Sequence, residues 1–433
     1  MIEFPAPEKN KRPIFALVDC NQFYVSCERV FQPYLEGKAV GVLSNNDGCL
    51  VALSPELKKL GITRGTPAFK IKPLLKKHEI YLFSSNYTLY GDMSSRVMRA
   101  LSSFAPDIEI YSIDEAFLSF KGMEDIDLIE YAQLIRQTVA KWTGIPVSIG
   151  IGPTKTLAKI ANKVAKTYKG YNGVFNITDH PKTEKILSSI DLEDIWGIGR
   201  KYAKKMKKIG LANAGDLLNL ENEWVKNNFT VVGLRTVLEL KGYPCIELEQ
   251  VSGNKKQIVS SRSFGKLITK IEDLEQALSF FCTTATERLR SQKSVAKQLM
   301  VYVCTNPYRN DPQYVNYISG ALPDYSAYTS DFISLGSKML RKIFKPGFLY
   351  KKCGIMLSDI ILEKDIQPNL FSLPYTSQNK KSVMQCIDGI NRRYGTNKVF
   401  FASNGIVKNW RMKRDILSPQ FTTCWAELPL IKD

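Results

Sequence analysis

The chain has 433 residues, enough for two to four domains with a sizeable core, and its 44% hydrophobic and 24% charged residues are typical of a globular protein. No run of 18 or more apolar residues occurs, and the first twelve residues lack a signal-peptide core, so we expect no membrane association and a cytoplasmic location. The 60 lysines and arginines exceed the 42 acids, and the formal charge of +18 favours a polyanionic partner.

Charge and cysteine placement narrow the class of protein further. Residues 141–210 contain 14 Lys and Arg against 5 Asp and Glu, so a net +9 of the total +18 falls within 70 residues, which suits a surface that follows phosphates. The nine cysteines form no C-x-x-C pair and the chain has two histidines, which argues against a zinc site and fits a reducing cytosol.

The first 151 residues alternate between strand-like and helix-like segments. The expected strands and helices occupy residues 14–18, 26–35, 39–43, 55–60, 92–104, 110–118, 128–142 and 147–151. This order predicts an α+β fold with a mixed sheet that helices cover on one face. A strong turn signal at residues 45–48 opens a small subdomain rich in lysine.

Carboxylates stand at two places in apolar, strand-like sequence. Asp114 and Glu115 interrupt residues 110–118, and the strand at residues 14–18 runs into Asp19. Unpaired burial of such charges is costly, so if the two strands are neighbours we expect Mg²⁺ to meet the three acids. Adjacent residues of a strand face opposite ways, so the acid pair must sit at a turn or strand end, or one acid must face elsewhere. Ordinary hairpin-turn acids are the alternative.

A glycine-rich loop at residues 150–156 resembles a phosphate loop but has the wrong spacing, which excludes ATP binding of that kind. It opens an expected helix at residues 156–167, whose lysines share one broad face: Lys155, Lys159, Lys163 and Lys166. A solvated helix face is the ordinary interpretation. The neighbouring acids favour phosphate contact.

Residues 194–200 place an apolar-Gly-apolar-Gly turn before a basic helix at residues 201–208. Backbone N–H groups at such a helix start can bind a phosphate without reading a base, so the segment is a helix–hairpin–helix candidate. A plain turn between two helices is the alternative.

Linker-like sequence at residues 242–244 and 253–256 precedes a second αβ unit of about 100 residues. Its expected strands and helices are residues 258–264, 273–292, 299–304, 314–319, 330–345 and 350–357. After Glu363, residues 367–371 read as a peptide that docks in a groove or as a loop tucked into its own domain. A further helix is expected at residues 382–394.

Four motifs stand in one order along the chain: DCNQFY at residues 19–24 with Cys27 and Glu28, SIDEAF at 112–117, GPTKTLAK at 152–159 and WGIG at 196–199. This set resembles the Y-family translesion DNA polymerases over residues 15–359. The sequences WRMKR at 410–414 and LSP at 417–419 are similar to the tail of the UmuC-like subgroup, the catalytic subunits of DNA polymerase V.

The resemblance implies a right-hand polymerase with palm, small fingers, helical thumb and little finger. The palm would comprise residues 1–45 and 91–180, the fingers 46–90, the thumb with its hairpin 181–245, the linker 246–255, the little finger 256–360 and a partner- and clamp-binding region 361–433.

The resemblance also assigns roles to residues. By motif match Asp19, Asp114 and Glu115 would be catalytic and would hold two Mg²⁺ ions with the Cys20 carbonyl. Tyr24 would exclude a 2′-hydroxyl, and Lys58 and Lys166 would contact the triphosphate. The DNA-binding residues would be Gly197, Gly199 and Arg200, and the clamp-binding residues Gln367, Leu370 and Phe371.

The implied activity is template-directed DNA synthesis past damaged bases, with primer-template DNA and dNTPs as substrates. The implied partners are a sliding clamp, a UmuD′-like dimer and a RecA filament. A non-catalytic DNA-binding scaffold and a palm-type nucleotidyl cyclase are the alternatives. The hairpin and the second αβ unit would be surplus in a cyclase.

Overall fold

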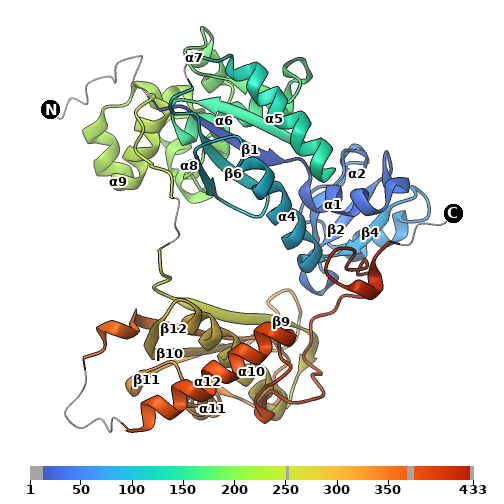
Figure 1. Ribbon diagram of the computed structural model, residues 1–433, viewed down its shortest axis with the longest axis vertical. Helices are drawn as coiled ribbons and strands as arrows, with labels where there is room; N and C mark the ends of the chain where they lie inside the picture. The colour runs from blue at the N-terminus through green and yellow to red at the C-terminus, as the bar shows by residue number, and fades with distance from the viewer. Residues whose placement is uncertain (1–12, 124, 250–252, 368–374, 430–433) are drawn as a thin grey trace. The chain divides into compact units, whose positions relative to one another are not determined.

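The computed structural model describes residues 13–123, 125–249, 253–367 and 375–429. The chain divides into two compact units, the first formed by residues 1–43, 49–252 and 416–433 and the second by residues 44–48 and 253–415. Figure 1 follows the chain through both. Within the described residues no helix combines the length and apolar character needed to cross a membrane.

A five-stranded mixed sheet forms the centre of the first unit, in the order β5-β6-β1-β7-β8. Its strands are β1 (Phe15–Cys20), β5 (Asp107–Ile110), β6 (Glu115–Ser119), β7 (Val147–Gly152) and β8 (Val174–Asn176). The pair β7 and β8 is parallel and the other pairs are antiparallel, so the expected mixed sheet is confirmed.

Helices cover both faces of this sheet, and the expectation of one covered face is wrong. Ala16 and Val18 of β1 pack into the core shared with α4 (Tyr87–Leu101) and α5 (Leu128–Thr143). Phe15 and Leu17 point the other way and pack on Ala158 of α6 (Lys155–Thr167). Every residue of β1 except Asp19 is buried, because its two faces both meet helices.

Short-range signals set the ends of these helices. Asp127 caps α5 by accepting from the backbone N–H groups of Ile129 and Glu130, and Gly144 ends the helix with φ +70°. Helix α6 lies so close to β7 that a Cβ on Gly150 would be 2.0 Å from the backbone nitrogen of Asn162. Helices α5 and α6 each begin and end within one residue of their predicted bounds, 128–142 and 156–167.

A smaller sheet of order β3-β2-β4 lies beside helix α1 (Phe23–Phe31). Its strands are β2 (Val40–Leu43), β3 (Leu50–Leu53) and β4 (Tyr81–Ser84), and short helices α2 (Pro55–Lys59) and α3 (Ala68–Ile71) accompany them. Strands β3 and β4 and helix α3, each four residues long, were not predicted, whereas β2, of the same length, was. Strand β2 belongs to this sheet although the fingers are expected to begin at residue 46.

Helices α7 (Thr183–Ser188), α8 (Arg200–Lys208) and α9 (Asn222–Leu240) share a core with one side of α6. The basic segment at 201–208 is helical as predicted. Gly197 has φ +89°, and a Cβ there would be 2.9 Å from the Thr236 hydroxyl, so glycine is needed at this turn.

The second unit is an antiparallel sheet of order β11-β10-β12-β9 with helices on one face. Its elements are β9 (Ile258–Ile268), α10 (Ile271–Ser291), β10 (Ser294–Thr305), β11 (Val315–Ser326), α11 (Thr329–Ile343), β12 (Tyr350–Leu362) and α12 (Tyr375–Tyr394). Arg290 of α10 binds the Asp388 carboxylate of α12 through two hydrogen bonds of 2.6 and 2.8 Å. The predicted αβ unit is confirmed.

The chain returns to the first unit at its C-terminal end, where residues 416–429 lie beside β4 (Figure 1). The backbone N–H of Ser84 donates to the carbonyl of Ile416 at 2.9 Å, so the segment joins the edge of the small sheet. No local pattern predicts this contact, because the two residues are 332 positions apart.

Candidate active site

Asp19 and Glu115 are cross-strand partners at one end of the central sheet. In the antiparallel pair of β1 and β6, Asp19 lies opposite Glu115. The backbone N–H of Cys20 donates to the carbonyl of Asp114 at 2.8 Å, which extends the ladder by one residue. The structure therefore brings the three predicted carboxylates to neighbouring backbone positions.

Asp114 lies in the turn between β5 and β6, so the acid pair does not occupy mid-strand positions. The Ser112 hydroxyl donates to the Asp114 carboxylate at 2.6 Å, and the same hydroxyl accepts from the backbone N–H of Glu115 at 3.0 Å. The turn explains how adjacent acids reach one edge, which a regular strand would not allow.

Two lysines of α6 pair with these acids. Lys166 Nζ is 2.5 Å from the Asp19 carboxylate, and Lys159 Nζ is 2.9 Å from that of Glu115. Lys159 also lies over the rings of Tyr111, at 4.3 Å, and Trp196, at 5.4 Å. Cation–π attraction to two rings holds this ammonium group in place.

Burial raises the pKa of Asp19 to about 6 against the opposing effect of Lys166, and the nearby Glu115 raises it further. Burial likewise raises the pKa of the Cys20 thiol, with the surrounding acids adding to the effect. Burial thus disfavours the charged form of Asp19 at this strand end, where three carboxylates stand beside two lysines, and a divalent cation would favour that charged form.

The donor set fits magnesium, since carboxylate and carbonyl oxygens are the ligands that this hard cation prefers. In the described part of the chain, no three His, Cys, Asp or Glu side chains are already grouped around a single metal position. Asp114 is engaged with Ser112 instead, and a change of its side-chain rotamer would free the carboxylate.

A pocket of about 700 Å³ opens beside the carboxylates. Asp19, Cys20 and Asp114 line it together with Tyr24, and its basic lining residues are Lys58, Arg64 and Lys166. Lys58 comes from α2 and Lys166 from α6, so residues over a hundred positions apart meet here. The pocket combines acids, cations and an aromatic ring, as binding of a nucleoside triphosphate requires.

Tyr24 lies on α1 and its ring stacks on that of Tyr90, with centroids 4.5 Å apart and planes 14° from parallel. The Tyr90 hydroxyl donates to the Glu28 carboxylate at 2.6 Å, and Tyr90 and Glu28 are both completely buried. The ring that lines the pocket is therefore backed by a buried polar network.

Glu28 gives a prediction for the pH dependence of stability. Burial raises the pKa of Glu28 to about 7, and the hydrogen bonds that it accepts from the neutral Tyr90, Ser418 and Gln32 offset this only in part. The native state therefore holds a proton that the unfolded chain releases near pH 4.5, and the contribution of Glu28 to stability falls as pH rises from about 4.5 to about 7.

We expect the free energy of unfolding of Glu28→Gln, relative to that of the wild type, to increase by roughly 3 kcal/mol between pH 5 and pH 8. Urea unfolding of both proteins across this range measures the difference, in which other titrating groups cancel. A difference that stays constant with pH would mean that Glu28 titrates as an exposed acid does.

The helix–hairpin–helix candidate keeps its glycines at the start of α8. Gly199 is the N-cap of α8, and a Cβ on it would meet open space. Arg200 is exposed at the first turn of the helix. Lys207 forms ion pairs with two acids, its Nζ lying 3.8 Å from the Asp191 carboxylate and 3.4 Å from that of Glu193.

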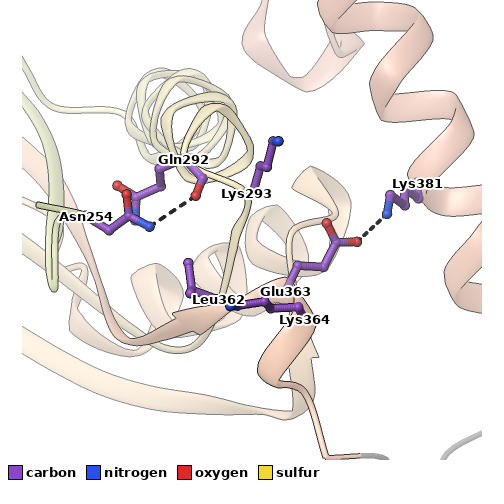
Figure 2. A pocket seen from close by; sticks show the side chains of 7 residues that line it. All are labelled: Asn254, Gln292, Lys293, Leu362, Glu363, Lys364 and Lys381. Atoms are coloured by element: carbon purple, nitrogen blue, oxygen red, sulfur yellow. Dashed lines mark hydrogen bonds and ion pairs between the residues drawn. The ribbon is translucent and has the colours of Figure 1, made fainter.

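A second pocket of about 610 Å³ lies in the second unit, and Figure 2 shows its polar, lysine-rich lining. Among the described residues that line this pocket, Glu363 is the one acid, and it pairs with Lys381 at 2.6 Å. The acidic cluster of the first pocket has no counterpart in this lining. Gln367 is exposed a few residues further on, while Leu370 and Phe371 of the proposed clamp peptide lie outside the described residues.

Sequence reasoning missed three features of the site. No pattern identified Arg64 as a pocket residue, and none linked Lys159 to Glu115. Lys155 was grouped with phosphate-contacting lysines, which is wrong, because it is 1% exposed and ion-paired with Glu109. A basic helix pattern places lysines on one face but does not tell which of them a partner acid buries.

The chain matches several family profiles along its length. Residues 18–163 match the impB/mucB/samB family, residues 255–370 the C-terminal domain of that family and residues 182–211 its HHH motif. Residues 381–431 match a domain of unknown function, DUF4113.

Similar proteins cover nearly the whole chain. Protein SamB of Salmonella typhimurium is 41% identical over 97% of this chain and 100% of its own, and protein UmuC of Salmonella typhimurium strain LT2 is 40% identical with the same coverage. Among solved structures, a Y-family DNA polymerase chimera Dbh-Dpo4(243-245)-Dbh has a TM-score of 0.66 at 21% identity, covering 81% of this chain and 99% of its own. An insertion ternary complex of Dbh DNA polymerase has a TM-score of 0.52 at the same identity and coverage.

Proposed function

The chain belongs to the impB/mucB/samB family, and from that premise we propose that its acidic pocket is a nucleotidyl-transfer centre in which Asp19, Asp114, Glu115 and the Cys20 carbonyl hold two Mg²⁺ ions. The protein is a DNA-directed DNA polymerase of the Y family that synthesises DNA past damaged template bases in SOS mutagenesis. DNA and deoxynucleoside triphosphates are its substrates, and a non-catalytic scaffold is not favoured.

One observation carries the proposal. Asp19 and Glu115 are partners across two strands, and Asp19 and Asp114 line a pocket that Lys58 and Lys166 also line. Divalent ions bound there would lower the pKa of the primer 3′-hydroxyl and offset charge on the phosphates. The lysines, with Arg64, would bind the triphosphate of the incoming nucleotide.

Tyr24 supplies sugar selection in this proposal. Its ring lines the pocket and is fixed by stacking on Tyr90, so it can block the space that a 2′-hydroxyl would need. On the duplex side, the turn at Gly197 and Gly199 with Arg200 would bind backbone phosphates through N–H groups and charge.

The tail would serve assembly. We place sliding-clamp contact at Gln367, Leu370 and Phe371, and contact with a UmuD′-like dimer and a RecA filament elsewhere in residues 361–433. The likeness to UmuC-type subunits supports these partners.

Primer extension tests the proposed centre by metal dependence. With primer-template DNA, dNTPs and Mg²⁺ we expect stepwise extension on intact and damaged templates, alone or with the candidate partners. Chelation of the metal should abolish extension, and excess Mg²⁺ should restore it. Extension that continues at the same rate in excess chelator would reject the metal-dependent centre.

A reaction without DNA provides the control. Free nucleotides with Mg²⁺ should yield no cyclic product if the protein is a polymerase. Cyclic nucleotide formed in the absence of primer and template would instead favour a palm-type cyclase.

A further inference from the structure

Residues 416–421 form a strap across the small sheet and helix α1 of the first unit. Ile416 pairs with Ser84 at the edge of β4, through one backbone hydrogen bond of 2.9 Å and a second from its N–H to the Ser84 hydroxyl at 3.2 Å. At the other end the ring of Phe421 stacks on that of Phe31, with centroids 4.9 Å apart and planes 11° from parallel. The strap is therefore anchored at both ends.

Ser418, midway along the strap, is 5% exposed and is held by a buried amide. The Asn86 side-chain nitrogen donates to the Ser418 carbonyl at 3.0 Å, to its hydroxyl at 3.0 Å and to the Pro419 carbonyl at 3.2 Å. Asn86 is itself 2% exposed and caps α4 by accepting from the backbone N–H of Leu89. All three hydrogen bonds of this amide nitrogen therefore go to residues of the strap.

The Ser418 hydroxyl donates in turn to the Glu28 carboxylate at 2.9 Å, across a separation of 390 residues. The same Glu28 oxygen accepts from the Tyr90 hydroxyl at 2.6 Å, and the Tyr90 ring stacks on Tyr24. A continuous chain of contacts therefore runs from the strap to the ring that lines the nucleotide pocket.

We propose that the strap is a positioning element of the nucleotide pocket, in which Ser418, acting through Glu28 and Tyr90, fixes the ring of Tyr24 and so sets discrimination against ribonucleotides. The inference rests on the proposed function, because it takes Tyr24 as the residue that excludes the 2′-hydroxyl. It assigns a role to part of the segment that matches a domain of unknown function.

The packing explains why loss of the Ser418 hydroxyl would change the position of the Tyr24 ring. Glu28 lies between the two on α1, one helical turn after Tyr24, and is 0% exposed. With one donor removed, its carboxylate must find another partner, and Tyr90 is the neighbour that shares the same oxygen. A Tyr90 ring that shifts gives the stacked Tyr24 room to move.

Nucleotide binding to a complex with a dideoxy-terminated primer tests the proposal without requiring turnover. The measured quantity is the ratio of the Kd values for a ribonucleotide and for the matching deoxynucleotide. Ser418→Ala should lower this ratio by ~5- to 10-fold, as expected for one hydrogen bond of about 1 kcal/mol, with little change in deoxynucleotide affinity. Glu28→Ala should act in the same direction, and Glu28→Gln, which keeps an acceptor oxygen, should stay near the wild type.

Two further variants calibrate the result. Thr423→Ala, on the same segment but with its hydroxyl 3.4 Å from Gln420, should leave the ratio unchanged. Tyr24→Ala should lower it by ~100-fold. If Tyr24→Ala leaves the ratio unchanged, the proposed role of Tyr24 fails and this inference fails with it. If Tyr24→Ala lowers the ratio while Ser418→Ala does not, or if Ser418→Ala weakens both nucleotides equally, the strap is merely structural and the inference alone is overturned.

Discussion

Asp114→Ala is expected to reduce the rate of single-nucleotide insertion on the order of 10³-fold or more, because the variant loses a carboxylate from the proposed metal site. Affinity for primer-template DNA should remain within a few-fold of the wild type, since Asp114 lines the pocket with Asp19 and Tyr24 and is not one of the residues proposed to bind the duplex. Insertion kinetics and fluorescence anisotropy with labelled DNA measure the two quantities on the same preparation.

Asp92→Ala is the matched control for this experiment. Asp92 is another aspartate of the first unit, and its carboxylate pairs with Arg96 one helical turn along α4, at 2.9 Å. Exposed pairs of this kind contribute little, so the control should insert nucleotides at the wild-type rate. Asp114→Ala activity close to that of the control would place the metal site elsewhere.

The sequence was sufficient to predict that the three acids gather, because the signal is local: charged carboxylates stand within apolar strand sequence. Carboxylates inside apolar strands must be paired, and an acid near the end of one strand lies beside an acid at the start of its antiparallel neighbour, as Asp19 and Glu115 do. The structure places Asp19 opposite Glu115 and puts Asp114 in the turn between β5 and β6, which was one of the two solutions open from the sequence. Most predicted helices and strands exist, but β10, β11, β12 and α12 extend five to seven residues beyond their expected bounds, and the strand expected at residues 110–118 is divided into β5 and β6.

The contacts that no local pattern encodes were the ones missed. Ser418 and Glu28 are 390 residues apart, and neither carries a signal that would pair them. Helix α6 was predicted, but its position on the second face of the sheet was not, because an apolar strand such as β1 looks the same in sequence whether one or both of its faces are covered. Such features depend on tertiary packing rather than on periodicity.

Lys155 illustrates the same limit and leads to a large expected effect on stability. Its ammonium group pairs with the Glu109 carboxylate and donates to the Glu247 carbonyl at 2.7 Å, while Glu109 accepts from the backbone N–H of Glu249 at 2.8 Å. Lys155→Met leaves a buried carboxylate without its cation, which costs about 3–5 kcal/mol in free energy of unfolding. Chemical unfolding followed by circular dichroism measures the loss.

Lys163→Met, on the same helix, is the matched control: it removes the same charge from an exposed ion pair instead of a buried one. Lys163 pairs with Asp194 at the surface, where both side chains are more than 40% exposed, so its loss should cost less than about 1 kcal/mol. The double variant Lys155→Met with Glu109→Gln should recover much of the stability, because the uncompensated charge is gone while an oxygen remains for the Glu249 N–H. If Lys155→Met were no more destabilising than Lys163→Met, the buried pair would not be what anchors residues 247–249 to the sheet.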